Sequence, residues 1–147
     1  MERMINSDAT NAGAPLTDLC KQLMSEVQRS YSEQQKLSDE LLSSLHFVFQ
    51  GPLSSALELV EKSSVTHIES PSGRALFQVI GTSGTPYTCF PNLRYCSCPA
   101  YNFSVLRKED HLMCKHVLAI QLSEAMGRSK KQSVSDAEIG NMIKEID

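Results

Sequence analysis

Apolar side chains recur at helical spacing from Leu16 onward. They fall at i, i+3, i+7, i+8, i+11 and i+15, on one face of a helix over residues 16–31: Leu16, Leu19, Leu23, Met24, Val27 and Tyr31. Thr17 is a candidate N-cap for this helix. Residues 1–14 are small and polar without any period, which predicts a disordered lead.

Two further helices are expected before the spacing of apolar residues changes from helical to strand-like. Ser38 can cap the first, whose apolar side carries Leu41, Leu42, Leu45, Val48 and Phe49. Gly51 is expected to end that helix, and Pro52 suits the first turn of the next one. The pattern therefore predicts a helical N-terminal region over residues 15–62.

A β-type pattern begins after residue 63. Short runs at 65–69 and 74–80 flank Ser70-Pro71-Ser72-Gly73, which has Pro and Gly at favoured places of a turn. A third strand is expected at 87–90, and residues 95–98 can extend the sheet. These strands predict a small antiparallel β-meander.

Helical spacing returns near the C-terminus. One helix is expected from about Lys115 to Gly127, followed by a basic stretch with Arg128, Lys130 and Lys131. Ser135 and Glu138 have the spacing of a capping box that opens a last helix, within residues 133–147. The expected fold class is α+β, with helices at both ends of the sheet.

Charge and composition limit the possible functions of the 147-residue chain. Its net charge is −3 and its pI about 5.8, which disfavours a protein that grips nucleic acid over its whole surface. It has no run near the ~20 apolar residues of a membrane span, and its first residues lack the apolar core of a signal peptide. We therefore expect an intracellular protein, in which five cysteines are metal ligands or buried thiols rather than disulfides.

Two closely spaced pairs of metal-binding residues lie in the second half of the chain. Cys96 and Cys98 form the first pair, and Cys114 and His116 form the second. Three thiolates and one imidazole are a standard tetrahedral set for Zn²⁺ and leave no open position for water. The pattern predicts one structural zinc ion, with buried thiols and a surface histidine as the alternative.

The spacing of the pairs also agrees with the expected secondary structure. The first pair lies at the end of a strand, where a backbone knuckle would turn both sulfurs to one side. The second lies at a helix start, where the helix dipole favours a thiolate. Cys89 is interpreted as a strand residue facing the core, and His111 as a loop residue.

The spacing Cys-x-Cys, a gap, and Cys-x-His with Ala three residues later resembles the SWIM-type zinc finger. Here these positions are Cys96, Cys98, Cys114, His116 and Ala119. The flanking sequences also resemble the small SWIM proteins of the animal Shu complex over roughly residues 37–140: SPSGR (70–74), YTC (87–89), YCSCPAYNFSVLRK (95–108), LMCKHVLA (112–119) and SVSD (133–136). The resemblance assigns residues 63–132 to a SWIM-type zinc finger domain.

The resemblance implies a non-enzymatic role in homologous recombination and DNA repair. Family members pair with a RecA-like ATPase paralogue, and the pair promotes assembly of the recombinase filament on single-stranded DNA in the nucleus. The chain is expected to reach DNA through that complex and to bind neither a membrane nor a small-molecule substrate. A zinc hydrolase or a thiol oxidoreductase is the disfavoured alternative, since a hydrolase needs an open metal position.

The segment between the two ligand pairs carries the candidate contact residues, which are Tyr101, Phe103, Leu106, Arg107 and Lys108. Aromatic residues beside basic ones can stack on bases and contact phosphate, so direct nucleic-acid binding by the finger is the alternative function. Aromatic and Arg residues are also enriched where proteins dock, so the segment can instead bind a protein partner. In a third alternative, the apolar half of the segment packs on the zinc domain itself. The helix over residues 16–31 either covers the protein's own core or lies in a groove of a partner.

Overall fold

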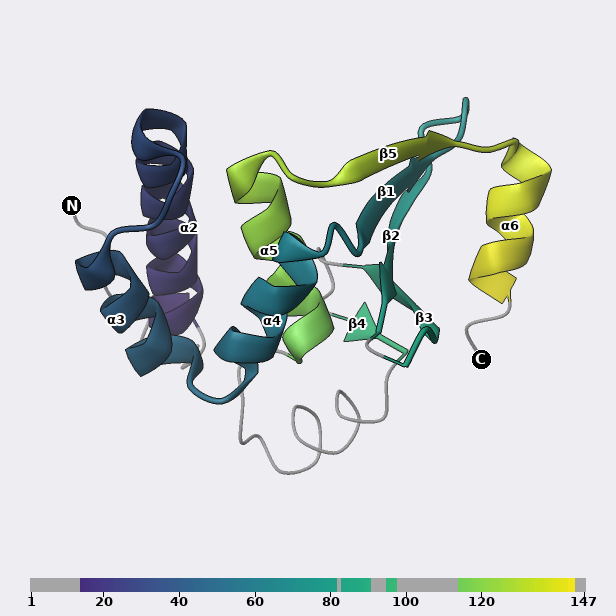
Figure 1. The fold of residues 1–147 in the computed structure, drawn as a ribbon. Helices are drawn as coiled ribbons and strands as arrows, with labels where there is room; N and C mark the ends of the chain where they lie inside the picture. The colour runs from purple at the N-terminus through teal and green to yellow at the C-terminus, as the bar shows by residue number, and fades with distance from the viewer. Residues whose placement is uncertain (1–13, 82, 91–94, 98–113, 145–147) are drawn as a thin grey trace.

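The structure is a computed structural model and describes residues 14–81, 83–90, 95–97 and 114–144. It has the expected α+β class, with helices on both sides of a sheet (Figure 1). The elements in chain order are α2 (Ala14–Gln34), α3 (Asp39–Phe49), α4 (Pro52–Glu61), β1 (Val65–Glu69), β2 (Ala75–Ile80), β3 (Pro86–Phe90), β4 (Tyr95–Cys96), α5 (Lys115–Met126), β5 (Lys130–Ser133) and α6 (Asp136–Lys144). The predicted disordered lead, residues 1–14, lies outside the described residues except for Ala14, which begins α2.

The sheet has five strands in the order β4-β3-β2-β1-β5. The first four strands pair antiparallel, as the meander predicts. The prediction was wrong about residues 130–133, which form β5 and pair parallel with β1, with Lys130 opposite Thr66. All four β5 side chains are exposed. The strand therefore lacks the alternation of apolar and polar residues by which a strand is predicted from sequence.

The two faces of the sheet are covered by different helices (Figure 1). Val65, Val79 and Cys89 lie in the core under α5, and α4 and α2 pack in turn on α5. On the opposite face, Ile68 and Leu76 pack with Ile139 of α6. These separate residue sets follow from the two-residue period of the strands.

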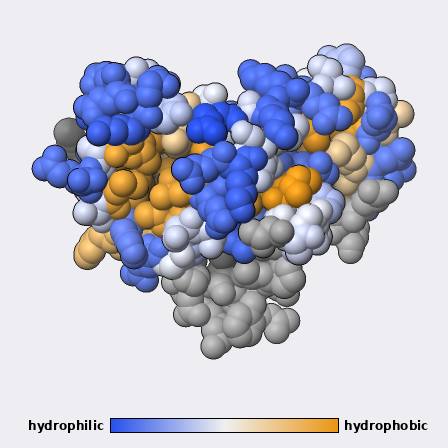
Figure 2. All heavy atoms as spheres, in the orientation of Figure 1, coloured by the Kyte–Doolittle hydropathy of each residue, from blue (hydrophilic) through white to orange (hydrophobic). Residues whose placement is uncertain are grey.

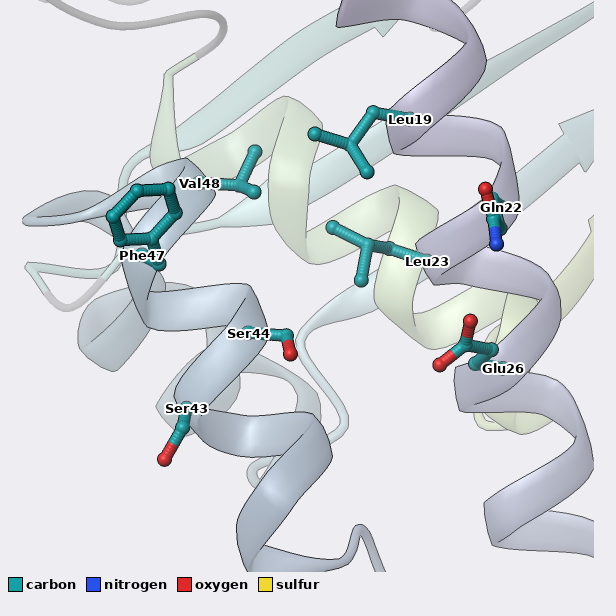
Figure 3. A pocket seen from close by; sticks show the side chains of 8 residues that line it. All are labelled: Leu19, Gln22, Leu23, Glu26, Ser43, Ser44, Phe47 and Val48. Atoms are coloured by element: carbon teal, nitrogen blue, oxygen red, sulfur yellow. The ribbon is translucent and has the colours of Figure 1, made fainter.

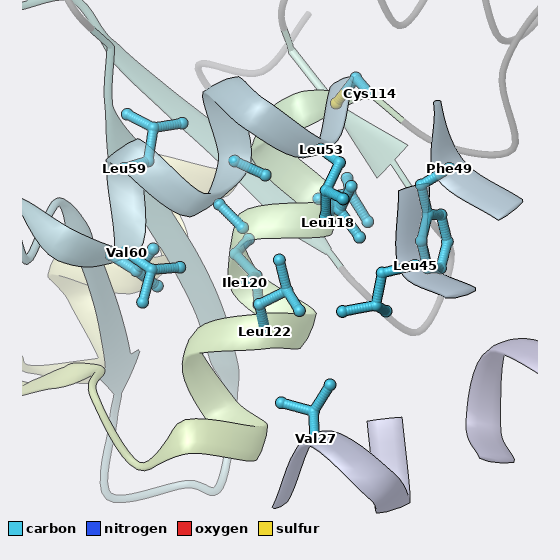
Figure 4. Packing of buried hydrophobic residues seen from close by; sticks show 14 of the residues in the cluster. Val27, Leu45, Phe49, Leu53, Leu59, Val60, Cys114, Leu118, Ile120 and Leu122 are labelled. Atoms are coloured by element: carbon cyan, nitrogen blue, oxygen red, sulfur yellow. The ribbon is translucent and has the colours of Figure 1, made fainter. Parts of the chain in front are cut away.

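Helix α5 lies at the centre of the molecule. Seven of its twelve residues are buried, and it packs against α2, α4 and the sheet. Figure 4 shows side chains from α2, α3 and α4 converging around Leu118 and Leu122. A helix with buried residues on so many sides is typical of a core position, and each fully buried leucine contributes about 1.5–3 kcal/mol.

Local signals in the sequence account for most helix ends. The Ser38 hydroxyl accepts a hydrogen bond from the Leu41 N–H at 3.2 Å, which confirms the predicted cap. Gly127 ends α5 in the left-handed conformation, with φ of 67°. Ser135 and Glu138 form both hydrogen bonds of the capping box, each 3.1 Å long.

Two predicted helix ends were wrong. Helix α2 begins at Ala14, so Thr17 lies inside the helix rather than at its cap. Helix α3 ends at Phe49 with Gln50 at φ of 56°, and Gly51 serves as the N-cap of α4.

The buried stripe of α2 is also turned relative to the prediction. Leu23 and Val27 are buried as expected, but the preceding buried residue is Cys20, while Leu19 is 38% exposed. Packing on α5 selects this face. One core joins the N-terminal helices to α5, and the proposed boundary at residue 63 stays a prediction.

Candidate metal centre

Cys114 and His116 lie together at the start of α5. Cys114 is the N-cap, with an extended backbone, and its carbonyl accepts the first helical bond, from the Leu118 N–H at 3.0 Å. Both side chains are only 3% exposed. The helix terminus favours negative charge at this point, which suits a bound thiolate.

The sheet edge brings Cys96 toward this helix end. Cys96 belongs to β4, and its backbone lies opposite Cys89 of β3. Cys89 is fully buried on the face covered by α5, as expected for a strand residue facing the core. Helix α5 packs against both β3 and β4, so the backbone of Cys96 lies on a strand that contacts the helix begun by Cys114 and His116.

Ser97 marks the place where β4 leaves the sheet. Its backbone N–H donates to the Thr88 carbonyl at 3.1 Å, and its hydroxyl accepts from the Thr88 N–H at 3.1 Å. In a regular antiparallel pair, the Ser97 carbonyl would accept that second bond. The hydroxyl stands in for it, so the Thr88 N–H keeps a hydrogen-bond acceptor at the end of β4.

Tyr87 packs against the second ligand pair. Its ring centroid lies 4.4 Å from that of His116, and the two rings are tilted by 31°. Tyr87 stands two residues before Cys89, on the same face of β3, which explains how it reaches α5. The ring contact limits how the imidazole can turn.

The comparisons with known proteins cover both the finger and the rest of the chain. The SWIM zinc finger family model matches residues 87–122, a stretch that contains both ligand pairs. Zinc finger SWIM domain-containing protein 7 of Danio rerio is 47% identical over 131 residues, which is 89% of this chain and 94% of that protein. The chain belongs to the zinc finger SWIM domain-containing protein 7 family.

Other members of this family extend the similarity across animals and beyond. The Homo sapiens protein of the same name is 44% identical over 128 residues, 87% of this chain and 91% of its own length. A Dictyostelium discoideum homologue is 37% identical over 112 residues, 76% of this chain and 72% of its own. No solved structure matches the chain.

Membership in the family confirms the SWIM resemblance and makes this a zinc finger protein. Cys98 and the predicted contact residues Tyr101, Phe103, Leu106, Arg107 and Lys108 lie outside the described residues, as does His111. Among the residues that the structure describes, no group of three or more Cys, His, Asp or Glu side chains is placed to hold a metal. The four-ligand set therefore stays a prediction.

The donors near the start of α5 fit the metal that the family implies. Cys114 supplies sulfur and His116 supplies nitrogen, and both are buried in the same helical turn. Sulfur and imidazole donors suit Zn²⁺, whereas Mg²⁺ and Ca²⁺ prefer oxygen. Ala119 lies one turn further along and is fully buried, as its place in the SWIM pattern would require.

Arg128 joins three helices rather than standing free at a helix end. Its guanidinium donates to the Tyr31 hydroxyl at 3.4 Å and to the Glu61 carbonyl at 3.3 Å. Its backbone N–H donates to the Ser123 carbonyl at 2.8 Å. In the same basic stretch, Lys130 and Lys131 are exposed on the edge strand β5.

No helix in the described part of the chain is both long and apolar enough to cross a bilayer.

Proposed function

We propose that this chain is a non-enzymatic, zinc-stabilised adaptor in homologous-recombination DNA repair. It pairs with a RecA-like ATPase paralogue in a Shu-type complex in the nucleus. The pair promotes assembly of the recombinase filament on single-stranded DNA, which the chain reaches through the complex. Membership in the SWIM protein 7 family, over 89% of the chain and 94% of a relative, supports a role for the whole protein rather than for the finger alone.

The proposed metal site holds one Zn²⁺ through Cys96, Cys98, Cys114 and His116. When bound, the ion supplies a cross-link between the β4 edge and the first turn of α5, and no reaction. Four protein ligands fill a tetrahedral zinc and leave no place for a hydrolytic water. This closed set is the reason for proposing a structural rather than a catalytic ion.

The observation that carries the proposal is the double role of α5. The helix that begins at Cys114 and His116 is also the helix on which α2, α4 and the sheet pack. A metal that fixes its first turn therefore fixes the geometry of the surfaces around it. An adaptor benefits from such a rigid arrangement, because a partner that contacts several elements binds more tightly when their relative positions are already fixed.

Co-expression with the RecA-like paralogue from the same source tests the proposal. We expect a stable hetero-complex containing one zinc per SWIM chain, measured by elemental mass spectrometry on the purified sample. The complex should accelerate recombinase filament assembly on single-stranded DNA, whereas the SWIM chain alone should not. A chain that forms no complex with the paralogue would overturn the proposal.

The same samples decide the alternative function. If the finger binds nucleic acid directly, the purified chain alone will bind single-stranded DNA at low salt. Replacing Arg107 and Lys108 together by Ala would then flatten the salt dependence of binding. Absence of binding by the chain alone at low salt would exclude this alternative.

A further inference from the structure

A groove of about 530 Å³ runs between α2 and α3 (Figure 3). Its apolar lining consists of Leu19 and Leu23 from α2 and Phe47 and Val48 from α3. Leu19 and Leu23 point across toward α3, and the Glu26 carboxylate and Ser44 hydroxyl point into the space between the helices. Figure 2 shows apolar atoms reaching the surface over the N-terminal helices, among strongly polar side chains.

Phe47 is an exposed aromatic residue on a helix that packs on the core through other side chains. Helix α3 buries Leu41, Leu45 and Phe49 toward the core, whereas Phe47 is 84% exposed. Two residues of helix correspond to a turn of about 200°, so Phe47 lies nearly opposite Leu45 and Phe49. A Phe side chain left in water forgoes the favourable free energy of its burial.

Leu19 is the second apolar residue left outside the core. Helix α2 packs through Cys20, Leu23 and Val27, and Leu19 is turned toward the groove with 38% of its surface exposed. Leu19 and Phe47 thus form the two walls of one apolar site on neighbouring helices. Neither contributes to the cluster of buried residues around α5.

The lining of the groove changes from apolar to acidic along its length. Toward the C-terminal end of α2, it is lined by Glu26, Glu33 and Glu40, with Arg29 as the basic residue among the lining side chains. Glu26 and Ser44 line both parts, so the apolar and acidic parts are continuous. From residue 19 to residue 33, the helix rises about 21 Å, the length of roughly four helical turns.

We propose that this groove binds an amphipathic helix of the RecA-like partner, with an apolar face at one end and Lys or Arg at the other. The apolar side chains lie against Leu19, Leu23 and Phe47, and the basic ones face the three glutamates. The excess of carboxylates repels nucleic acid at this site, which leaves a basic protein segment as the complementary occupant. The inference rests on the proposed function, because it takes the partner from there.

Binding of purified full-length chain to the RecA-like paralogue, measured by isothermal titration calorimetry, tests the groove. Phe47→Ser should weaken binding at least tenfold, and Phe47→Trp should retain it. The double variant Glu26→Lys/Glu40→Lys should also weaken binding and flatten its salt dependence. Ile143→Ser, which changes an apolar residue 37% exposed on α6, and Glu124→Lys, on the exposed side of α5, are the matched controls and should bind within twofold of wild type.

Folding is checked on the same samples. Phe47, Glu26 and Glu40 contribute no fully buried side chain, so melting temperature and zinc content should equal those of wild type. A photo-cross-linking amino acid at position 47 should also link to a helix of the paralogue that carries Lys or Arg beside its apolar face. Cross-links confined to another kind of segment would contradict the assigned occupant.

The outcomes separate the groove from the function. If wild type binds the paralogue and Phe47→Ser binds it equally well, the proposal that the groove binds the partner helix is overturned. The adaptor role would remain intact. No binding of the paralogue by wild type would overturn the adaptor role, and the groove's assignment to that partner with it. A homodimer detected by light scattering that dissociates in Phe47→Ser would make the groove a contact between copies of this chain, which also overturns the proposal.

Discussion

Ser97 and Thr88 bond to each other twice, once through two backbone groups and once through the Ser97 hydroxyl. The serine stands between the first two cysteines of the SWIM pattern. Its hydroxyl keeps the Thr88 N–H satisfied at the point where the strand ends. The residue between the two cysteines therefore supports the backbone at the end of β4, although it is not itself a proposed ligand.

Ser97→Ala removes that acceptor. Loss of one hydrogen bond of this kind costs about 0.5–1.5 kcal/mol, and the knuckle becomes freer to turn. We expect weaker zinc binding, measured by competition with a chromogenic chelator, together with a slightly lower melting temperature. Ser97→Thr keeps the hydroxyl and should restore both properties; an Ala variant with unchanged zinc affinity would show that the hydroxyl does not position the site.

Cys114→Ala and His116→Ala should each release zinc and destabilise the whole chain. Structural zinc contributes directly to folding, and these residues begin the core helix α5, so we expect a loss on the order of 4 kcal/mol. Chemical denaturation and elemental analysis of the same sample measure the two effects. Partner binding should be lost with them.

Cys20→Ala is the matched control for the metal ligands. Cys20 is buried on α2, outside the proposed ligand set, and is 6% exposed. This variant should keep one zinc ion and lose far less stability. A Cys114→Ala protein that kept both its zinc and its stability would mean that the ligands have been assigned to the wrong residues.

Arg128→Ala should lower stability by about 1–2 kcal/mol, because the guanidinium bonds both the Tyr31 hydroxyl and the Glu61 carbonyl. Arg128→Lys should not restore it, since an ammonium group lacks the planar fork that reaches two acceptors. A double-mutant cycle with Tyr31→Phe, measured by urea unfolding, isolates the bond to α2. Lys131→Ala, on the exposed strand β5, should change stability by less than about 0.5 kcal/mol.

Acid should loosen α6 through Asp136. Hydrogen bonds from the Ser72 hydroxyl, then the Ser70 hydroxyl and the Ser72 N–H, together with the charge of Arg74, lower the pKa of Asp136. A carboxylate with a lowered pKa stabilises the fold above its ordinary pKa of about 3.9, and this contribution is lost as pH falls through the lowered value. The protection of the Ile139 amide, measured as its exchange rate relative to that of an unfolded chain at the same pH, should therefore fall below about pH 4.

Asp136→Asn tests the assignment. The variant should show faster exchange at Ile139 already at neutral pH and a weaker dependence on acid. Ser72→Ala removes the hydroxyl but keeps the N–H that donates to Asp136 at 3.1 Å, so its effect should be intermediate. Equal acid sensitivity in wild type and Asp136→Asn would place the responsible group elsewhere.

The elements that could be predicted from the sequence carry local signals. Ser38 and Ser135 cap helices through their own side chains, and the turn at Ser70–Gly73 separates two apolar runs. β5 lacks such a signal, because Lys130–Ser133 pairs with β1 through its backbone and exposes every side chain. The face of α2 was also ambiguous, since residues 16, 19 and 23 and residues 20, 23 and 27 both form helical stripes.

The second ligand pair was placed correctly at a helix start, because Cys114 and His116 come directly before and within an apolar run. The supporting residues were missed. Tyr87 could have been found from its two-residue spacing to Cys89, which puts both on the face that α5 covers. Ser97 had no such signal, because its role depends on where the strand stops.

The position of α5 bears on how much of this protein a cell contains. If the zinc ligands are as proposed, a newly made chain that has not met zinc lacks the helix on which three other elements assemble. Such a chain exposes apolar residues that proteases and chaperones recognise. Zinc scarcity would then lower the abundance of the protein, and on the proposed function recombination would fail for want of the adaptor and not through an inactive form of it.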